Sequence, residues 1–234
     1  MKRVTPMLEK AIQEVIHPVM IGSGFMCMRA NVYRAKWSTD EVEQLIFLSV
    51  SEVKGRETVL KSHFGLRNWI AEIFGCHMVR SYGGDGFKEF KCDEPDSCAM
   101  RSSFDRLDQR DWVVRIRDLQ GREIGKRYQD FIRDYLVPTF GPVTTLQELL
   151  SLLAANLDCC PWFATNGAIR AAQIVAVARQ IGLSADQIRS MLEPRKVFIA
   201  NGGGGTSRIR SDPDGYITQM LDDWSAGSYN TARG

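Results

Sequence analysis

The sequence predicts an α+β fold, in which an N-terminal helix and an antiparallel meander of strands precede a group of helices. Between Gly24 and Trp69, three runs rich in β-branched and aromatic residues are separated by polar breaks, which is typical of consecutive strands. After Gly121 the apolar residues change to helical spacing. Strands first and helices afterwards indicate helices grouped on one face or at one end of an antiparallel sheet.

The N-terminal part is expected to begin with a helix. Thr5 and Pro6 suit its cap and first turn, and Pro18 should end or kink it. A first strand follows within Gly24 to Trp37, where apolar and charged residues mix, so this strand has a solvated face or forms a sheet edge. The almost wholly apolar run Leu45 to Val50 is expected to be the central strand, although a buried helix can contain the same short run.

The rest of the sheet region is less regular. A third strand passes through residues 63–67, and Trp69 to Phe74 fits either more strand or a short turn of helix. Ser81 to Ser97 is rich in Gly, Asp and Pro, so it is expected to form a long loop. Cys98 to Leu107 and Trp112 to Ile116 are expected to be the last pair of strands.

Four further helices are expected after the sheet. The first has an apolar stripe that stops at Pro138, and the third covers about Asn166 to Ile181. The second and the fourth open on capping boxes, formed by Thr145 with Glu148 and by Ser184 with Gln187.

These elements divide the chain into three regions. Residues 1–120 hold the first helix and the sheet, and residues 121–200 hold helices packed on that sheet in the same domain. Residues 201–234 are expected to be a flexible Gly-rich tail with a short amphipathic segment around Tyr216 to Trp224.

The composition narrows the classes of function. Thirty Lys and Arg against 28 Asp and Glu leave a net charge of +2, too near balance to predict a nucleic-acid or membrane partner. The N-terminus lacks a signal-peptide core and no apolar run is long enough to span a membrane, so we expect a cytoplasmic protein. The six cysteines then fit reduced thiols, although Cys92 and Cys98 could pair if the protein were exported.

Neither a metal site nor a cofactor is predicted. His17, His63 and His77 lie in separate expected elements, and no Cys-x-x-Cys motif occurs. The Gly-rich residues 202–205 are not followed by the Gly-Lys-Ser/Thr sequence of a phosphate-binding loop and do not join a strand to a helix, so they are interpreted as a linker. A hydrolase that uses a cysteine and a histidine stays an alternative, because sequence does not show which of these side chains meet.

A DNA-binding regulator is the other alternative. Residues 175–196 combine an Ala-rich helix, a glycine turn, a serine cap and a second helix, which is the spacing of a helix-turn-helix. Few cations follow, chiefly Arg189, Arg195 and Lys196, whereas affinity for DNA depends on many cationic contacts. Any tight helical hairpin has the same spacing, so the charge argues against a nucleic-acid partner.

The best candidate for a binding surface is the loop from Ser81 to Ser97, because it combines aromatic anchors with acidic groups that suit a basic protein partner. The charged stretch Arg101 to Arg133 is a second possibility for docking, although such alternation is mostly a solvated, internally paired face. The partner-binding residues predicted in the loop are Tyr82, Asp85, Phe87, Glu89, Phe90, Asp93, Glu94 and Asp96.

Four short motifs follow the leading helix: Gly24-Phe25, Tyr33-Arg34, Phe64-Gly65 and Asp111-Trp112. In this order they resemble the bacterial domain-of-unknown-function family numbered 4304, over roughly residues 5–155. The resemblance implies an α+β domain with no established reaction and no catalytic residues, similar to the immunity partners of bacterial toxins. The leading hypothesis is therefore a non-catalytic, cytosolic immunity-type protein that binds and neutralises a toxin through a sheet edge and the acidic, aromatic loop.

Overall fold

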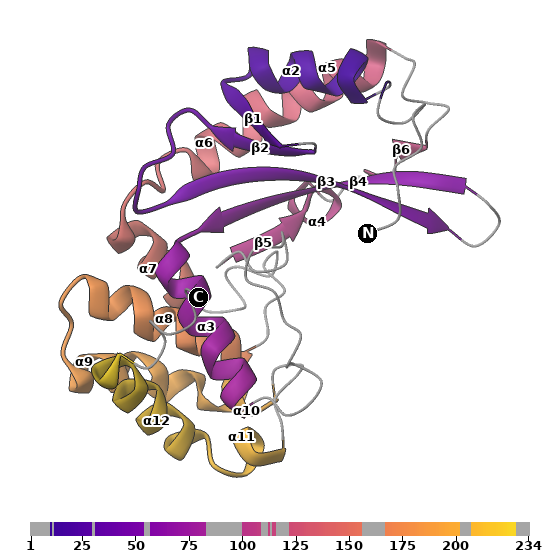
Figure 1. The fold of residues 1–234 in the computed structure, drawn as a ribbon. Helices are drawn as coiled ribbons and strands as arrows, with labels where there is room; N and C mark the ends of the chain where they lie inside the picture. The colour runs from indigo at the N-terminus through magenta and orange to yellow at the C-terminus, as the bar shows by residue number, and fades with distance from the viewer. Residues whose placement is uncertain are drawn as a thin grey trace. The chain divides into compact units, whose positions relative to one another are not determined.

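The computed structural model describes residues 10, 12–29, 31–53, 57–82, 100–108, 112, 114–115, 122–155, 167–201 and 207–227 (Figure 1). By its internal contacts the chain forms two compact units. Unit 1 comprises Met1–Gly65 and Ser102–Thr144, and unit 2 comprises Leu66–Arg101 and Thr145–Gly234. The predicted α+β class is confirmed, because an N-terminal helix and an antiparallel meander precede a mostly helical C-terminal part.

Unit 1 contains most of an antiparallel sheet whose first five strands are neighbours in sequence order. These strands are β1 (Phe25–Arg29), β2 (Val32–Ala35), β3 (Glu43–Val53), β4 (Glu57–Arg67) and β5 (Met100–Ser103), and β6 (Val114–Arg115) pairs with β4. The predicted central strand lies in β3, where four consecutive side chains from Leu45 to Leu48 are buried. Successive residues of a strand point to opposite faces, so both faces of β3 are covered here, as its apolar run indicates.

Two prolines lie inside helical segments of unit 1 that they were expected to end or kink. The N-terminal helix continues from the π-helical turn η1 (Ile12–Ile16) into α2 (His17–Gly22), with Pro18 in the first turn of α2. Likewise, α5 (Arg122–Phe131) leads through the π-helical turn η5 (Ile132–Leu136) into α6 (Val137–Phe140), with Pro138 at its start. The prediction that the helix stops at Pro138 was wrong, and of the two outcomes expected at Pro18, an end or a kink, the structure excludes the end. A wider π turn ends just before each proline, so the proline lies in the first turn of the α-helical segment that follows. The N–H that proline lacks would have no partner within that first turn, so the helix tolerates the ring there.

The predicted strand from Cys98 to Leu107 was also wrong in its second half. Within the described residues, β5 ends at Ser103 and the short helix α4 (Phe104–Asp108) follows. Phe104 and Leu107 are both buried, and their spacing of three residues places them on the same face of a helix. Phe104 lies against the rings of Trp112, Tyr128 and Phe131, with centroids 5.2, 5.8 and 4.6 Å away, so this turn closes the aromatic core of unit 1.

A buried glutamine ties the start of β3 to the end of α6. The Gln44 side-chain amide donates hydrogen bonds to the carbonyl oxygens of Phe140 at 2.8 Å and Val143 at 3.1 Å, and its oxygen accepts one from Trp37 Nε1 at 2.9 Å. The last carbonyls of a helix have no partner within the helix. The carbonyl oxygen of Phe140 also accepts a hydrogen bond from the Val143 N–H at 2.9 Å, so Gln44 adds a second partner there and joins the helix end to β3.

Unit 2 is a group of helices around α8 (Gly167–Gln180), which is buried on nearly every side. It packs against α3 (Trp69–Tyr82), α7 (Leu146–Ala154), α9 (Ala185–Leu192), α10 (Lys196–Asn201) and α12 (Pro213–Ala226). The 3-10 turn η6 (Glu193–Arg195) joins α9 to α10, and α11 (Ser207–Ser211) precedes α12. The residues after Trp69, for which strand and helix were both considered, thus form a helix of 14 residues.

Local signals correctly placed two helix starts in unit 2. Both predicted capping boxes are confirmed, with each serine or threonine side chain and its partner three residues later exchanging hydrogen bonds with the backbone. Helix α12 is longer than the amphipathic segment expected around Tyr216 to Trp224. Asp212 caps its start, and Gly227 ends it in the left-handed conformation. Two of its own residues, Tyr216 and Met220, are buried.

Candidate functional site

Strand β1 lies at one end of the strand order, and among the described strands it pairs only with β2. Its first residue, Phe25, is fully buried, whereas every later residue of the strand is exposed. Because neighbouring side chains point to opposite faces, the strand is open to solvent on both faces beyond Phe25. We call the exposed side chains here the β1 surface: Ile21, Met26, Cys27, Met28 and Arg29.

The local sequence explains why β1 is anchored at only one end. Gly24 has a φ of 88°, and a Cβ there would lie 2.9 Å from the ring of Trp37. Phe25 packs edge-on against the same ring, with 5.2 Å between centroids. Past Cys27 the pairing register with β2 shifts, which is a bulge, and Asn31 turns the chain with a φ of 66°.

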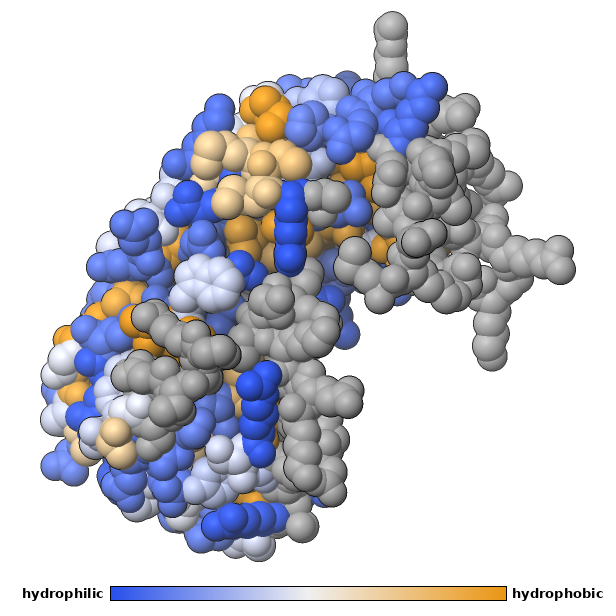
Figure 2. Space-filling view, in the orientation of Figure 1, coloured by the Kyte–Doolittle hydropathy of each residue, from blue (hydrophilic) through white to orange (hydrophobic). Residues whose placement is uncertain are grey.

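The β1 surface is apolar as well as exposed. Met28 is 57% exposed, Ile21 39% and Met26 38%, and only five large apolar side chains of the described residues reach such values. Figure 2 shows hydrophobic atoms gathered over the α2 and β1 part of unit 1, next to hydrophilic neighbours. Methionine side chains are flexible and polarisable, so they adapt to different partner surfaces. An exposed apolar group of this kind, on a strand with an open edge, suits contact with another protein.

The bulge and Arg29 limit what can pair with this edge. Bulges and charged residues on an edge strand hinder uncontrolled pairing between sheets. The β1 surface therefore combines apolar contact groups with features that disfavour aggregation, which is the combination expected of a specific binding edge.

The predicted binding loop is described only at its beginning. Tyr82 is the last residue of α3, where its ring packs edge-on against Tyr216 at 5.7 Å and lies under the Arg208 guanidinium at 4.9 Å. Burial, and then the charge of Asp223, raise the pKa of Tyr82. Tyr82 thus contributes to the packing of α3 on α12. Lying outside the described residues are Asp85, Phe87, Glu89, Phe90, Asp93, Glu94 and Asp96.

The three histidines lie in three different surroundings. His17 in α2 is beside the buried ring of Tyr33, whose pKa burial raises to about 12. His63 Nε2 lies 3.1 Å from Ser49 Oγ on the adjacent strand, and His77 Nε2 lies 3.3 Å from Asp223 Oδ2. No group of three or more potential metal ligands gathers among the described residues.

Two of the six cysteines lie within the described residues. Cys27 is exposed on β1, and its thiol is 3.4 Å from the carbonyl oxygen of Arg29, whereas Cys76 is buried in α3. Cys92, Cys98, Cys159 and Cys160 lie outside the described part of the chain.

Residues 175–196, with the predicted helix-turn-helix spacing, contain the end of α8, a short turn and α9, with Gly182 in the left-handed conformation and Ser184 as cap. Two of its three cations, Arg189 and Lys196, are held by neighbouring side chains, however. Arg189 donates a hydrogen bond to Thr218, and Lys196 lies 2.6 Å from carboxylate oxygens of both Glu193 and Asp214. A phosphate contact from either cation would first require breaking these interactions.

No family model, curated protein or solved structure matches the chain. The resemblance to family 4304 therefore stays a prediction. In the part of the chain that the structure describes, none of the helices combines the length and the apolar character needed to cross a bilayer.

The β1 surface was only partly visible in the sequence. The mixed apolar and charged residues from Gly24 to Trp37 indicated an edge, but the individual contact residues were sought in the loop after Ser81. The alternation of Met26 and Met28 with Cys27 and Arg29 is the signal in the sequence, and it becomes informative only when both faces are known to be exposed.

Proposed function

We propose that this protein is a non-catalytic protein-binding module and that its contact surface includes the β1 surface. The observation that carries the proposal is the exposure of Met26 and Met28 on an edge strand whose two faces are both open. A partner strand or loop that docks there would gain backbone hydrogen bonds along the edge and apolar contacts from the methionines.

The finer form of the proposal is that the partner is a bacterial toxin, which this protein neutralises in the cytoplasm. It is supported by the family resemblance over roughly residues 5–155 and by the kind of surface that β1 presents. Blocking a toxin requires a stable contact and no reaction, so a surface with apolar anchors is sufficient for this role.

Co-expression with the protein encoded by the adjacent upstream gene tests this function. We expect the two proteins to elute together in size-exclusion chromatography, and the cells to be protected from toxicity. Hydrogen exchange of the complex should show slowed exchange at the backbone amides of Phe25–Arg29, because docking removes that edge from solvent. Separate elution without protection would contradict the toxin partner. A complex with unchanged exchange at β1 would exclude the β1 surface from the contact.

A further inference from the structure

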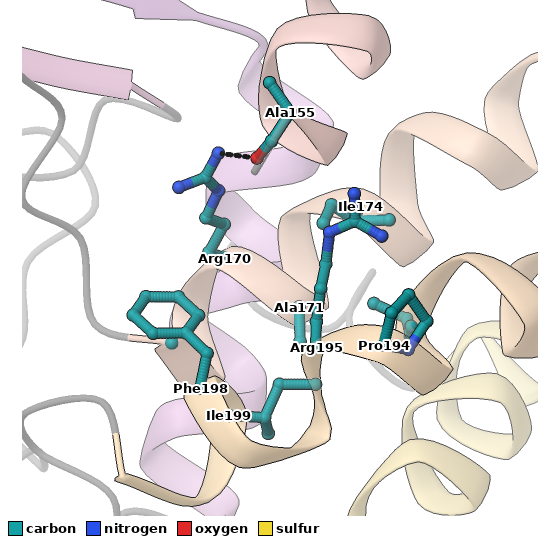
Figure 3. A pocket seen from close by; sticks show the side chains of 10 residues that line it. Ala155, Arg170, Ala171, Ile174, Pro194, Arg195, Phe198 and Ile199 are labelled. Carbon is teal, nitrogen blue, oxygen red and sulfur yellow. Dashed lines mark hydrogen bonds between the residues drawn. The ribbon is translucent and has the colours of Figure 1, made fainter. Parts of the chain in front are cut away.

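Unit 2 contains a cavity between α8, η6 and α10 whose described lining includes two arginines and no carboxylate. It has a volume of about 50 Å³, and its lining includes Ala155, Arg170, Ile174, Arg195 and Phe198. Figure 3 shows Arg170 pointing to Ala155 and Arg195 lying beside Ile174, with apolar side chains around them. Apart from the two guanidinium groups, the side chains of this lining are apolar.

Arg170 is fixed in place by the end of α7. It is 3% exposed, and its guanidinium donates hydrogen bonds to the carbonyl oxygens of Leu153 at 2.8 Å and Ala155 at 3.0 Å. These carbonyls belong to the last turn of a helix, which carries partial negative charge. Arg170 is therefore a rigid cation in the wall of the cavity.

Arg195 is a cation that its own neighbours do not neutralise. Within the described residues, its guanidinium donates a hydrogen bond to the carbonyl oxygen of Met191 and has no ion pair. The nearby carboxylates of Glu193 and Asp214 bind Lys196 instead. Burial lowers the pKa of Arg195, because partial removal from water disfavours its charged form. An anion at this position would compensate that charge.

We propose that this cavity binds a small organic anion, with its charged group at Arg195 and its short apolar part against α8 and Phe198. A single water needs roughly 10–15 Å³ of such space, so the enclosed part holds roughly three to five non-hydrogen atoms. That space fits a carboxylate with one or two further carbon atoms, or a phosphate group alone, so the remaining atoms of a longer anion would extend toward the cavity mouth. Two arginines and apolar walls suit a carboxylate and a phosphate ester equally. The proposal does not depend on the protein-binding function.

Calorimetric titration of the full chain with butyrate, butyramide and methyl phosphate tests the site. Butyrate should bind at one site with a dissociation constant on the order of 1 mM, and butyramide, which has the same shape without the charge, should bind at least about tenfold more weakly. Tighter binding of methyl phosphate than of butyrate would assign the site to phosphate esters, and the reverse order would assign it to carboxylates. Binding of neither anion, or equal binding of butyrate and butyramide, would overturn the proposal.

Three variants separate the site from non-specific binding of anions. Arg195→Gln should weaken butyrate binding about tenfold, and Arg195→Lys should weaken it less, because it keeps the charge and loses only the planar guanidinium. Arg189→Gln is the matched control, since Arg189 lies in the same unit outside the cavity and bonds Thr218. Its affinity should equal that of the wild type. Equal weakening in the Arg189 and Arg195 variants would contradict the site even if one variant were less stable.

Discussion

Replacing Glu72 with Ala should lower the free energy of unfolding by about 3–5 kcal/mol, the loss expected when one partner of a buried ion pair is removed. The Glu72 side chain in α3 is fully buried, and its Oε2 lies 3.4 Å from Nε of Arg67, which is 10% exposed. The guanidinium of Arg67 also lies 4.4 Å from the centre of the exposed Trp69 ring. Without Glu72, a largely buried cation would lose its carboxylate, and urea unfolding of the purified variant measures the difference.

Glu193→Ala is the matched control for the loss of a carboxylate. The Glu193 side chain is 64% exposed in its ion pair with Lys196, so its removal should change the free energy of unfolding by less than about 1 kcal/mol. The double variant Arg67→Met with Glu72→Leu should be more stable than Glu72→Ala, because no unpaired charge is left buried. Equal stability of Glu72→Ala and Glu193→Ala would show that the buried pair is not needed in unit 2.

Replacing Phe104 with Ala should destabilise the protein by about 3–5 kcal/mol, because the substitution leaves a cavity at the centre of an aromatic cluster. The Phe104 ring is fully buried and is surrounded by the rings of Trp112, Tyr128 and Phe131. The guanidinium of Arg127 lies over the Trp112 ring, 4.4 Å from its centre. The aromatic contacts add to the loss from buried area. Urea unfolding followed by tryptophan fluorescence measures the effect.

Phe104→Leu is the control that keeps most of the apolar volume, and it should lose less than half as much stability as Phe104→Ala. If the alanine variant were as stable as the wild type, α4 would not close the core of unit 1. The strand predicted for this part of the sequence would then need to be considered again.

Short-range signals predicted the fold class and several of its boundaries. The apolar run at Leu45 to Val50 lies in strand β3 with its first four side chains buried, and the two capping boxes start helices at the expected residues. These features depend on neighbours a few residues apart, so a single sequence contains the information needed to predict them.

Features that depend on distant partners could not be predicted in the same way. Gln44 bonds carbonyl groups about one hundred residues later, and Arg170 bonds carbonyls of a preceding helix. In the sequence both look like ordinary polar residues. The π turns before Pro18 and Pro138 leave no motif that marks them, so the rule that proline ends a helix gave a wrong boundary at Pro138.

The residues of the candidate site also depend on distant partners, so the sequence alone predicted them only in part. An edge was expected within Gly24 to Trp37, but exposure on both faces of β1 follows from where Phe25 and Trp37 anchor it. Tyr82 was predicted to contact a partner because it is an aromatic residue at the start of an acidic loop. In the structure its ring instead contacts Tyr216 and Arg208 where the helices of unit 2 pack together. Whether an aromatic residue contacts a partner or its own core depends on tertiary structure.

The affinity of the Met28→Lys variant for the upstream-encoded protein tests most directly whether β1 binds a protein partner. Met28 is 57% exposed, so the variant should fold normally, but docking would bury an unpaired ammonium group. Val197→Lys is the matched control, because Val197 is an exposed apolar residue of α10 at 73%. We expect binding about 100-fold weaker for Met28→Lys and unchanged for Val197→Lys. Affinities within about twofold of each other for both variants and the wild type would contradict the claim.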